Sequence, residues 1–105
     1  MAVGLARIGP QGLTTQSDDV RLEFLRTELA TGFTLARLAE TERQIGDKGA
    51  AARCLELAEK AYSTVARFLS DETHSRHVPD ACRGELETGM RLLRETLRRN
   101  AETFA

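Results

Sequence analysis

Residue types that bind metals gather in one stretch of this 105-residue chain, between Asp71 and Cys82. His74 and His77, joined by Cys82 or by Asp71 and Glu72, offer the nitrogen, sulfur and oxygen ligands that zinc takes in a tetrahedral shell. The spacing matches no strong zinc template, and Cys82 falls on the apolar side of a helical pattern. We favour a polar loop with solvated imidazoles, and the alternative is a small metal- or ligand-binding regulatory protein that uses this loop.

The chain shows no pattern typical of an active site. Nucleophilic catalysis needs a cysteine or serine beside a positioned base, whereas Cys54 stands among apolar residues of a helical pattern, where a buried thiol is inert. Carboxylates alternate with arginines on polar faces, and the phosphate-binding motifs G-x-x-x-x-G-K-[ST] and G-x-G-x-x-G do not occur. We therefore expect no catalytic residue, no bound cofactor and no enzymatic activity.

Arginines form a ridge in the last third of the chain, where Arg91, Arg94 and Arg98 recur at spacings of three and four residues. One interpretation is a contact with phosphate groups, which would make the protein a nucleic-acid accessory protein. Glu87 and Glu95 lie nearby and favour the other interpretation, an exposed face of internal ion pairs. No aromatic residue stands among the arginines to stack on bases, so we do not favour nucleic acid as the partner.

Apolar residues recur at intervals of three and four in three long segments, which predicts helices over about residues 17–46, 47–71 and 80–104. The first two segments are separated by a very short link that forces a hairpin. The matched lengths of all three segments predict an all-α domain over residues 17–105. We expect an antiparallel up-down-up three-helix bundle. Residues 1–16 sustain no period, and we expect a flexible lead-in there.

The ends of these segments carry residues suited to close a helix. Ser17, Asp47 and Asp80 are candidate N-caps, because their side-chain oxygens can accept a bond from an unpaired N–H of the first turn. Gly46 is suited to the left-handed position that follows a helix C-terminus. A glycine at position 32, in mid-helix, lowers helix stability by about 1 kcal/mol relative to alanine. We favour close approach of a neighbouring helix as the reason that glycine stands there.

The first segment is apolar on more than one side. Phe24, Phe33, Leu35 and Leu38 widen its apolar surface beyond one stripe, which is typical of a helix with a partner outside the chain. That partner is another protein or a second copy of this chain, so we expect a homo-oligomer. Seven residues are the predicted partner-binding set: Phe24, Phe33, Leu35, Leu38, Arg91, Arg94 and Arg98.

The pattern Leu35-x-x-Leu38-Ala39, then Ile45-Gly46-Asp47, then Ala51-x-x-x-Leu55-x-x-Ala58 resembles a single tetratricopeptide-type helical hairpin. In that family, small residues at the positions of Ala39, Ala51 and Ala58 let two antiparallel helices approach closely. The sequence departs at Glu42, where an aromatic residue is usual, and no second copy of the repeat is present. It departs again at Ser63, where proline is usual. The resemblance implies a protein-binding role and transfers no catalytic residue.

Composition and charge further narrow the classes of function that this chain can have. The formal net charge of −1 gives no overall field toward nucleic acid or an anionic membrane. No apolar run approaches the roughly 18 residues of a membrane-spanning helix, and the start lacks the apolar core of a secretory signal. Two cysteines are too few for a disulfide scaffold, so we expect a cytoplasmic protein. The sequence as a whole predicts a non-enzymatic helical interaction or scaffold module that self-associates.

Overall fold

A computed structural model describes the backbone of residues 10–104 and the side chains of residues 18–102. This part of the chain is helical and contains no strand, which confirms the predicted all-α class. Four helices pack together: α2 (Pro10–Gln44), α3 (Lys48–Ser70), α4 (Glu72–Ser75) and α5 (Asp80–Phe104). The shortest of them, α4, lies within the link that the sequence analysis treated as a polar loop.

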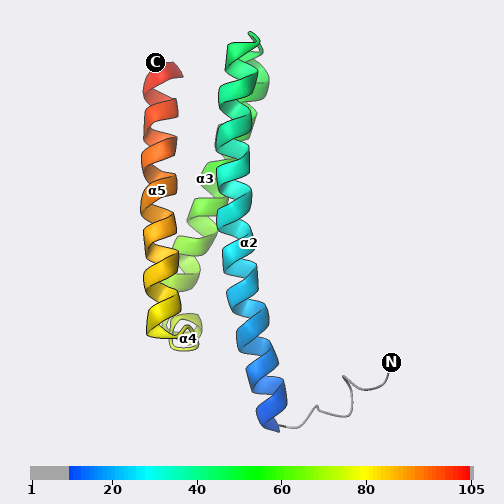
Figure 1. Cartoon of the computed structure of the whole chain (residues 1–105), viewed down its shortest axis with the longest axis vertical. Coiled ribbons are helices and arrows are strands. Elements are labelled where there is room, and N and C mark those ends of the chain that lie inside the picture. The colour runs from blue at the N-terminus through cyan, green and yellow to red at the C-terminus, as the bar shows by residue number, and fades with distance from the viewer. Residues whose placement is uncertain (1–9, 105) are drawn as a thin grey trace, which may run out of the picture.

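The three long helices lie side by side in an elongated molecule of 54 × 32 × 18 Å. In Figure 1, α2 and α5 run in the same direction, and α3 returns between them in the opposite direction at the back. The single-turn helix α4 lies at the lower end, where α3 passes into α5. The N-terminal part of α2 extends beyond the lower ends of the other helices (Figure 1).

The first helix begins earlier than its apolar pattern predicts. α2 starts at Pro10, seven residues before Ser17, so Ser17 lies inside the helix and the expected N-cap there is wrong. Proline suits a first helical position because its fixed φ is helical and its missing N–H has no intrahelical partner there. Residues 10–16, predicted as part of a flexible lead-in, are helical, while residues 1–9 lie outside the described residues. Periodicity reveals only turns that bury a face, which explains the difference.

One aspartate both ends α2 and begins α3. Gly46 adopts a φ of +94°, and the N–H of Asp47 donates to the Glu42 carbonyl at 2.8 Å, as in a Schellman C-cap. The Asp47 carboxylate then accepts a bond from the N–H of Ala50 at 2.9 Å, which caps α3. The predicted roles of Gly46 and Asp47 are confirmed.

A second aspartate, at the other end of α3, likewise caps two helices. The N–H of Asp71 caps the end of α3, and its carboxylate accepts from the N–H of Thr73 at 2.8 Å to cap α4. Asp80, predicted to cap the last helix, is instead its first helical residue. The Pro79 carbonyl accepts the first bond of α5, from the N–H of Arg83 at 2.8 Å. Asp80 therefore contributes its negative charge to the positive end of the helix dipole.

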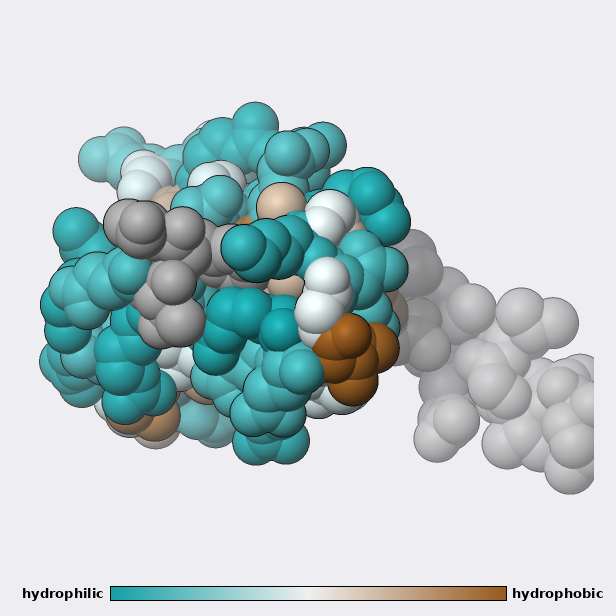
Figure 2. All heavy atoms as spheres, turned by 90° about the horizontal axis from the view of Figure 1, so that it is seen from above, coloured by the Kyte–Doolittle hydropathy of each residue, from teal (hydrophilic) through white to brown (hydrophobic). Residues whose placement is uncertain are grey.

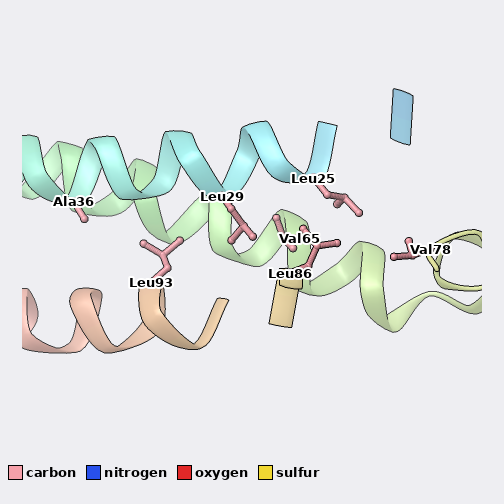
Figure 3. Close-up of a cluster of buried hydrophobic side chains, with 7 residues drawn as sticks. All are labelled: Leu25, Leu29, Ala36, Val65, Val78, Leu86 and Leu93. Carbon is pink, nitrogen blue, oxygen red and sulfur yellow. The ribbon is translucent and has the colours of Figure 1, made fainter. Parts of the chain in front are cut away.

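The core is a file of aliphatic side chains drawn from all three long helices (Figure 3). Val78, from the link before α5, lies at the right-hand end of this cluster in Figure 3. The cluster consists of Leu25, Leu29, Ala36, Val65, Val78, Leu86 and Leu93. Each long helix contributes one apolar stripe to this core. The burial of these stripes away from water is the main favourable contribution to the free energy of folding.

Small residues line the contact between α2 and α3. The alanines at positions 36 and 39 of α2 and at positions 51 and 58 of α3 have no exposed surface, and Ala61 is 6% exposed. Gly32 continues this seam where α5 joins the pair: a Cβ built there would lie 3.5 Å from the Ala61 Cβ and 2.7 Å from Leu93 Cδ2. Close helix approach, the explanation favoured for Gly32, is confirmed.

Replacing glycines with alanine should separate close packing from helix propensity. Gly84→Ala, in α5 with nothing within 4 Å of the new Cβ, should raise the free energy of unfolding by about 1 kcal/mol. Gly32→Ala should lower it by about 1 kcal/mol, because the contact with the fully buried Leu93 outweighs the gain in propensity. Denaturant unfolding measures both, and equal stabilisation by the two substitutions would contradict the tight contact at Gly32.

The cap at Asp47 can be tested in the same way. Asp47→Ala should lower the free energy of unfolding by about 1 kcal/mol, because the N–H of Ala50 loses its acceptor. Asp47→Asn keeps an acceptor oxygen at the same place and serves as the control. A loss in the asparagine variant as large as in the alanine variant would show that charge, rather than the hydrogen bond, stabilises this end of α3.

Candidate interaction surfaces

A row of uncharged side chains runs along the outer side of α2, opposite its buried stripe. Its members recur at alternating spacings of four and three residues, and all of them are exposed. The row, called here the α2 row, consists of Val20, Phe24, Thr27, Thr31, Thr34, Leu38, Thr41 and Ile45. The side chains of Val20 and Ile45 are 68% and 71% exposed, and those of Phe24 and Leu38 are 40% and 43% exposed. Apolar groups on this scale are candidates for burial against another molecule.

The threonines of the α2 row are less polar than their residue type suggests. The Thr34 hydroxyl donates to the Ala30 carbonyl at 3.0 Å, and the Thr41 hydroxyl donates to the Arg37 carbonyl at 3.3 Å. Both hydroxyl hydrogens are thus satisfied within the helix. Burying these two threonines against a partner therefore leaves no unpaired donor, which lowers the desolvation cost.

The structure divides the four apolar residues that the sequence analysis assigned to partner binding. Phe24 and Leu38 belong to the α2 row, whereas Phe33 is half-buried and packs against the core. Leu35 is half-buried on the flank of α2. The sequence analysis named two members of the row and missed the other six, because threonine and a lone valine or isoleucine carry little signal until the covered side of the helix is known.

Phe24 also belongs to a short aromatic stack that joins α2 to α3 and α4. Its ring centroid lies 5.3 Å from that of Phe68, in a tilted arrangement with 48° between the ring planes. Phe68 in turn lies 4.5 Å from the imidazole of His74. Phe24 is thus held by α3 on one side and open on the other, which fixes this end of the α2 row.

The two histidines of the predicted metal loop face different surroundings. His74 stacks on Phe68, and its buried Nδ1 has no hydrogen-bond partner among the described residues. His77 Nδ1 lies 3.3 Å from the Asp18 carboxylate, which also binds Arg21 at 2.9 Å. Within residues 18–102, no three His, Cys, Asp or Glu side chains form a group that could hold a metal ion.

Arg98 of the arginine ridge on α5 is ion-paired within its own helix. The Arg98 guanidinium donates to both Glu95 and Glu102, the latter at 2.7 Å. Arg91 donates to the hydroxyl of Thr88 at 3.3 Å. The hydrogen bond from Arg98 lowers the pKa of Glu95 below its ordinary value, and the same bond raises the pKa of Arg98. This arrangement is the one expected for the exposed, internally paired alternative.

A shallow apolar groove of about 350 Å³ lies between α3 and α5, toward the end at which α2 passes into α3. Leu55 and Leu97 form its floor, and Glu56 and Glu59 stand among its lining residues. Arg94 lines an adjoining hollow beside Tyr62. Seen from this end, the surface is mostly hydrophilic, with hydrophobic side chains in isolated places (Figure 2). The sequence analysis did not foresee this groove.

Comparison with family models, with curated proteins and with solved structures gives no significant match for this chain. None of the described helices is long and apolar enough to cross a membrane. The candidate surfaces are therefore interpreted from their own chemistry.

The pairing of Glu95 with Arg98 predicts a measurable pH effect. Because the folded pKa of Glu95 is lowered, the stabilising pair is present above the ordinary carboxyl pKa and is lost as the pH falls through the lowered value. Carboxyl ¹³C NMR should find the pKa of Glu95 below the ordinary value of a glutamate, and Arg98→Gln should return it to the ordinary range. An unchanged Glu95 titration in that variant would mean that Arg98 is not the cause.

Proposed function

We propose that this protein is a non-enzymatic helical interaction module that self-associates through the α2 row. A single observation carries the proposal, which is the absence of charge from the row. Between residues 18 and 43, α2 carries ten charged side chains, and none of them falls on it. A solvated helix face normally carries charged or strongly polar residues, so a charge-free exposed face over more than six turns is typical of a surface that another molecule covers.

The surroundings of the reactive side chains support the non-enzymatic part of the proposal. Cys54 and Cys82 are half-buried, and Cys82 packs against the core cluster. The Glu95 carboxylate on α5 already accepts a hydrogen bond from Arg98. A nucleophile with a neighbouring base is the arrangement that covalent catalysis requires, and these contacts describe packing and ion pairing instead.

We also propose that α2, α3 and α5 form an up-down-up three-helix bundle whose first two helices act as a tetratricopeptide-like binding hairpin. The support for the hairpin is the burial of Ala39, Ala51 and Ala58, the three positions at which that family carries small residues. The support for its use in binding is that the α2 row lies on one helix of the same hairpin.

A charge placed in the α2 row should abolish self-association. Leu38→Lys, at a residue 43% exposed in the single chain, should leave the circular dichroism spectrum nearly unchanged. It should raise the dissociation constant of the oligomer by about thirtyfold or more, because a lysine would have to be buried in the contact. Sedimentation velocity over a range of concentrations measures both the oligomer and its loss.

Leu92→Lys is the matched control. Leu92 is 57% exposed and lies on α5, outside the α2 row, so its substitution should leave the oligomer intact. The proposal is contradicted if the wild-type chain sediments as a monomer at every concentration, or if the two lysine variants dissociate the oligomer equally.

A further inference from the structure

We infer that the partner covering the α2 row is the same row of a second copy, in antiparallel orientation, with the two-fold axis passing between Thr31 and Thr34. This inference rests on the proposed function and adds to it the orientation, the register and the contacts of the pair. Four properties of the row carry it: its period, the sizes of its side chains, the charges on its flanks and its openness.

The period of the α2 row is that of a coiled-coil seam. Spacings of four and three residues average about 3.5 residues per turn, slightly under the period of a straight helix, so two such rows stay in contact by a left-handed supercoil. From Val20 to Ile45 the row spans about 37 Å at a rise of about 1.5 Å per residue. This length is ample for a two-helix contact.

The side chains of the row alternate in size in a way that favours the antiparallel pairing. One set of alternate positions holds the large residues Phe24, Leu38 and Ile45 together with Thr31, and the other set holds Val20 and three threonines. A parallel pair would place each residue opposite its own copy. Phe24, Leu38 and Ile45 would then form layers of two large residues, and three successive layers of paired threonines would lie between Phe24 and Leu38.

Antiparallel pairing about the stated axis places a member of one set opposite a member of the other in every layer. Four kinds of layer result, and the two-fold axis repeats each of them: Val20 with the second copy's Ile45, Phe24 with Thr41, Thr27 with Leu38, and Thr31 with Thr34. The three kinds that contain a large residue then hold one large and one small β-branched side chain. Layers of nearly equal volume pack without voids or overlap, which is the condition for a stable helix contact.

The charges that flank the row favour the same orientation. In the antiparallel register, Arg21 of one copy lies beside Glu42 of the other, and the two-fold axis repeats this attractive pair. In a parallel register, Glu23 of one copy would lie beside Glu28 of the other, and Arg37 beside Glu42, so a repulsive and an attractive pair would offset each other. The net charge of −1 adds little repulsion between the two copies.

The α2 row is open for such a contact in the single chain. α3 holds the Phe24 flank of α2 through Phe68, and α5 holds the opposite flank, where Arg26 donates to the Glu85 carboxylate at 3.0 Å. Both neighbours thus approach from the buried side of α2 and leave the row exposed. A second copy can therefore reach the row without moving α3 or α5, and the Arg21 guanidinium, which binds Asp18 at 2.9 Å in the single chain, is the group that must also turn toward the second copy's Glu42.

Cysteine crosslinking tests the orientation. In a full-length background carrying Cys54→Ala and Cys82→Ala, one sample carries Val20→Cys and another carries Ile45→Cys. A short bismaleimide should crosslink chains when the two variants are mixed and should leave each variant alone uncrosslinked, because like positions lie at opposite ends of the pair. Crosslinking of each variant with itself indicates a parallel pair, which overturns this inference and leaves the proposed function intact.

A charge exchange tests the register in the chain with its own cysteines. Arg21→Glu should raise the dimer dissociation constant about five- to tenfold, and Glu42→Arg alone should do the same. The double variant Arg21→Glu/Glu42→Arg should restore the wild-type constant, because the pair is reversed rather than broken. Failure of the double variant to restore it overturns the register. A wild-type chain that remains monomeric throughout overturns the proposed function and this inference together.

Discussion

The close approach of α2 to α3 is the constraint on which the rest of the structure depends. Alanines on both helices, with Gly32 at the junction with α5, leave little more than methyl groups between the two backbones. Because α3 lies so close to α2, it covers only a narrow strip of the α2 surface. The leucines of α5 cover the strip beside it. The opposite side of α2 is left without a neighbour within the chain, so the packing that stabilises the hairpin also creates the exposed α2 row.

The connections between the helices are short because single residues serve two helices at once. Asp47 donates its N–H to the end of α2 and uses its carboxylate to cap α3, and Asp71 does the same between α3 and α4. Local hydrogen bonds close both junctions and help to set the directions in which successive helices run. The tight turn at Gly46 also brings the alanine stripes of α2 and α3 face to face, which links turn chemistry to packing.

Polar and aromatic groups around α4 reinforce the packing of α2 against α3. Phe68 lies between Phe24 and His74, and His77 approaches the carboxylate of Asp18 on α2. These contacts connect α4 and the link before α5 to the first helix. They hold Phe24 in place at one end of the α2 row, so the predicted metal loop takes part in shaping the candidate interaction surface.

The sequence by itself determined the three long helices, the ends of α3 to within a residue and the roles of Gly46 and Asp47, because periodic burial and capping are local properties. It could not determine that α2 starts at Pro10, because those first turns have no apolar period, nor that Phe33 packs inward while Phe24 remains open. The α2 row could not be predicted either, since threonine is common on both exposed and covered faces. Its role is visible only once the neighbours of α2 are known. Only the tertiary structure decides which side of a helix is covered, because that choice depends on contacts between residues far apart in the chain.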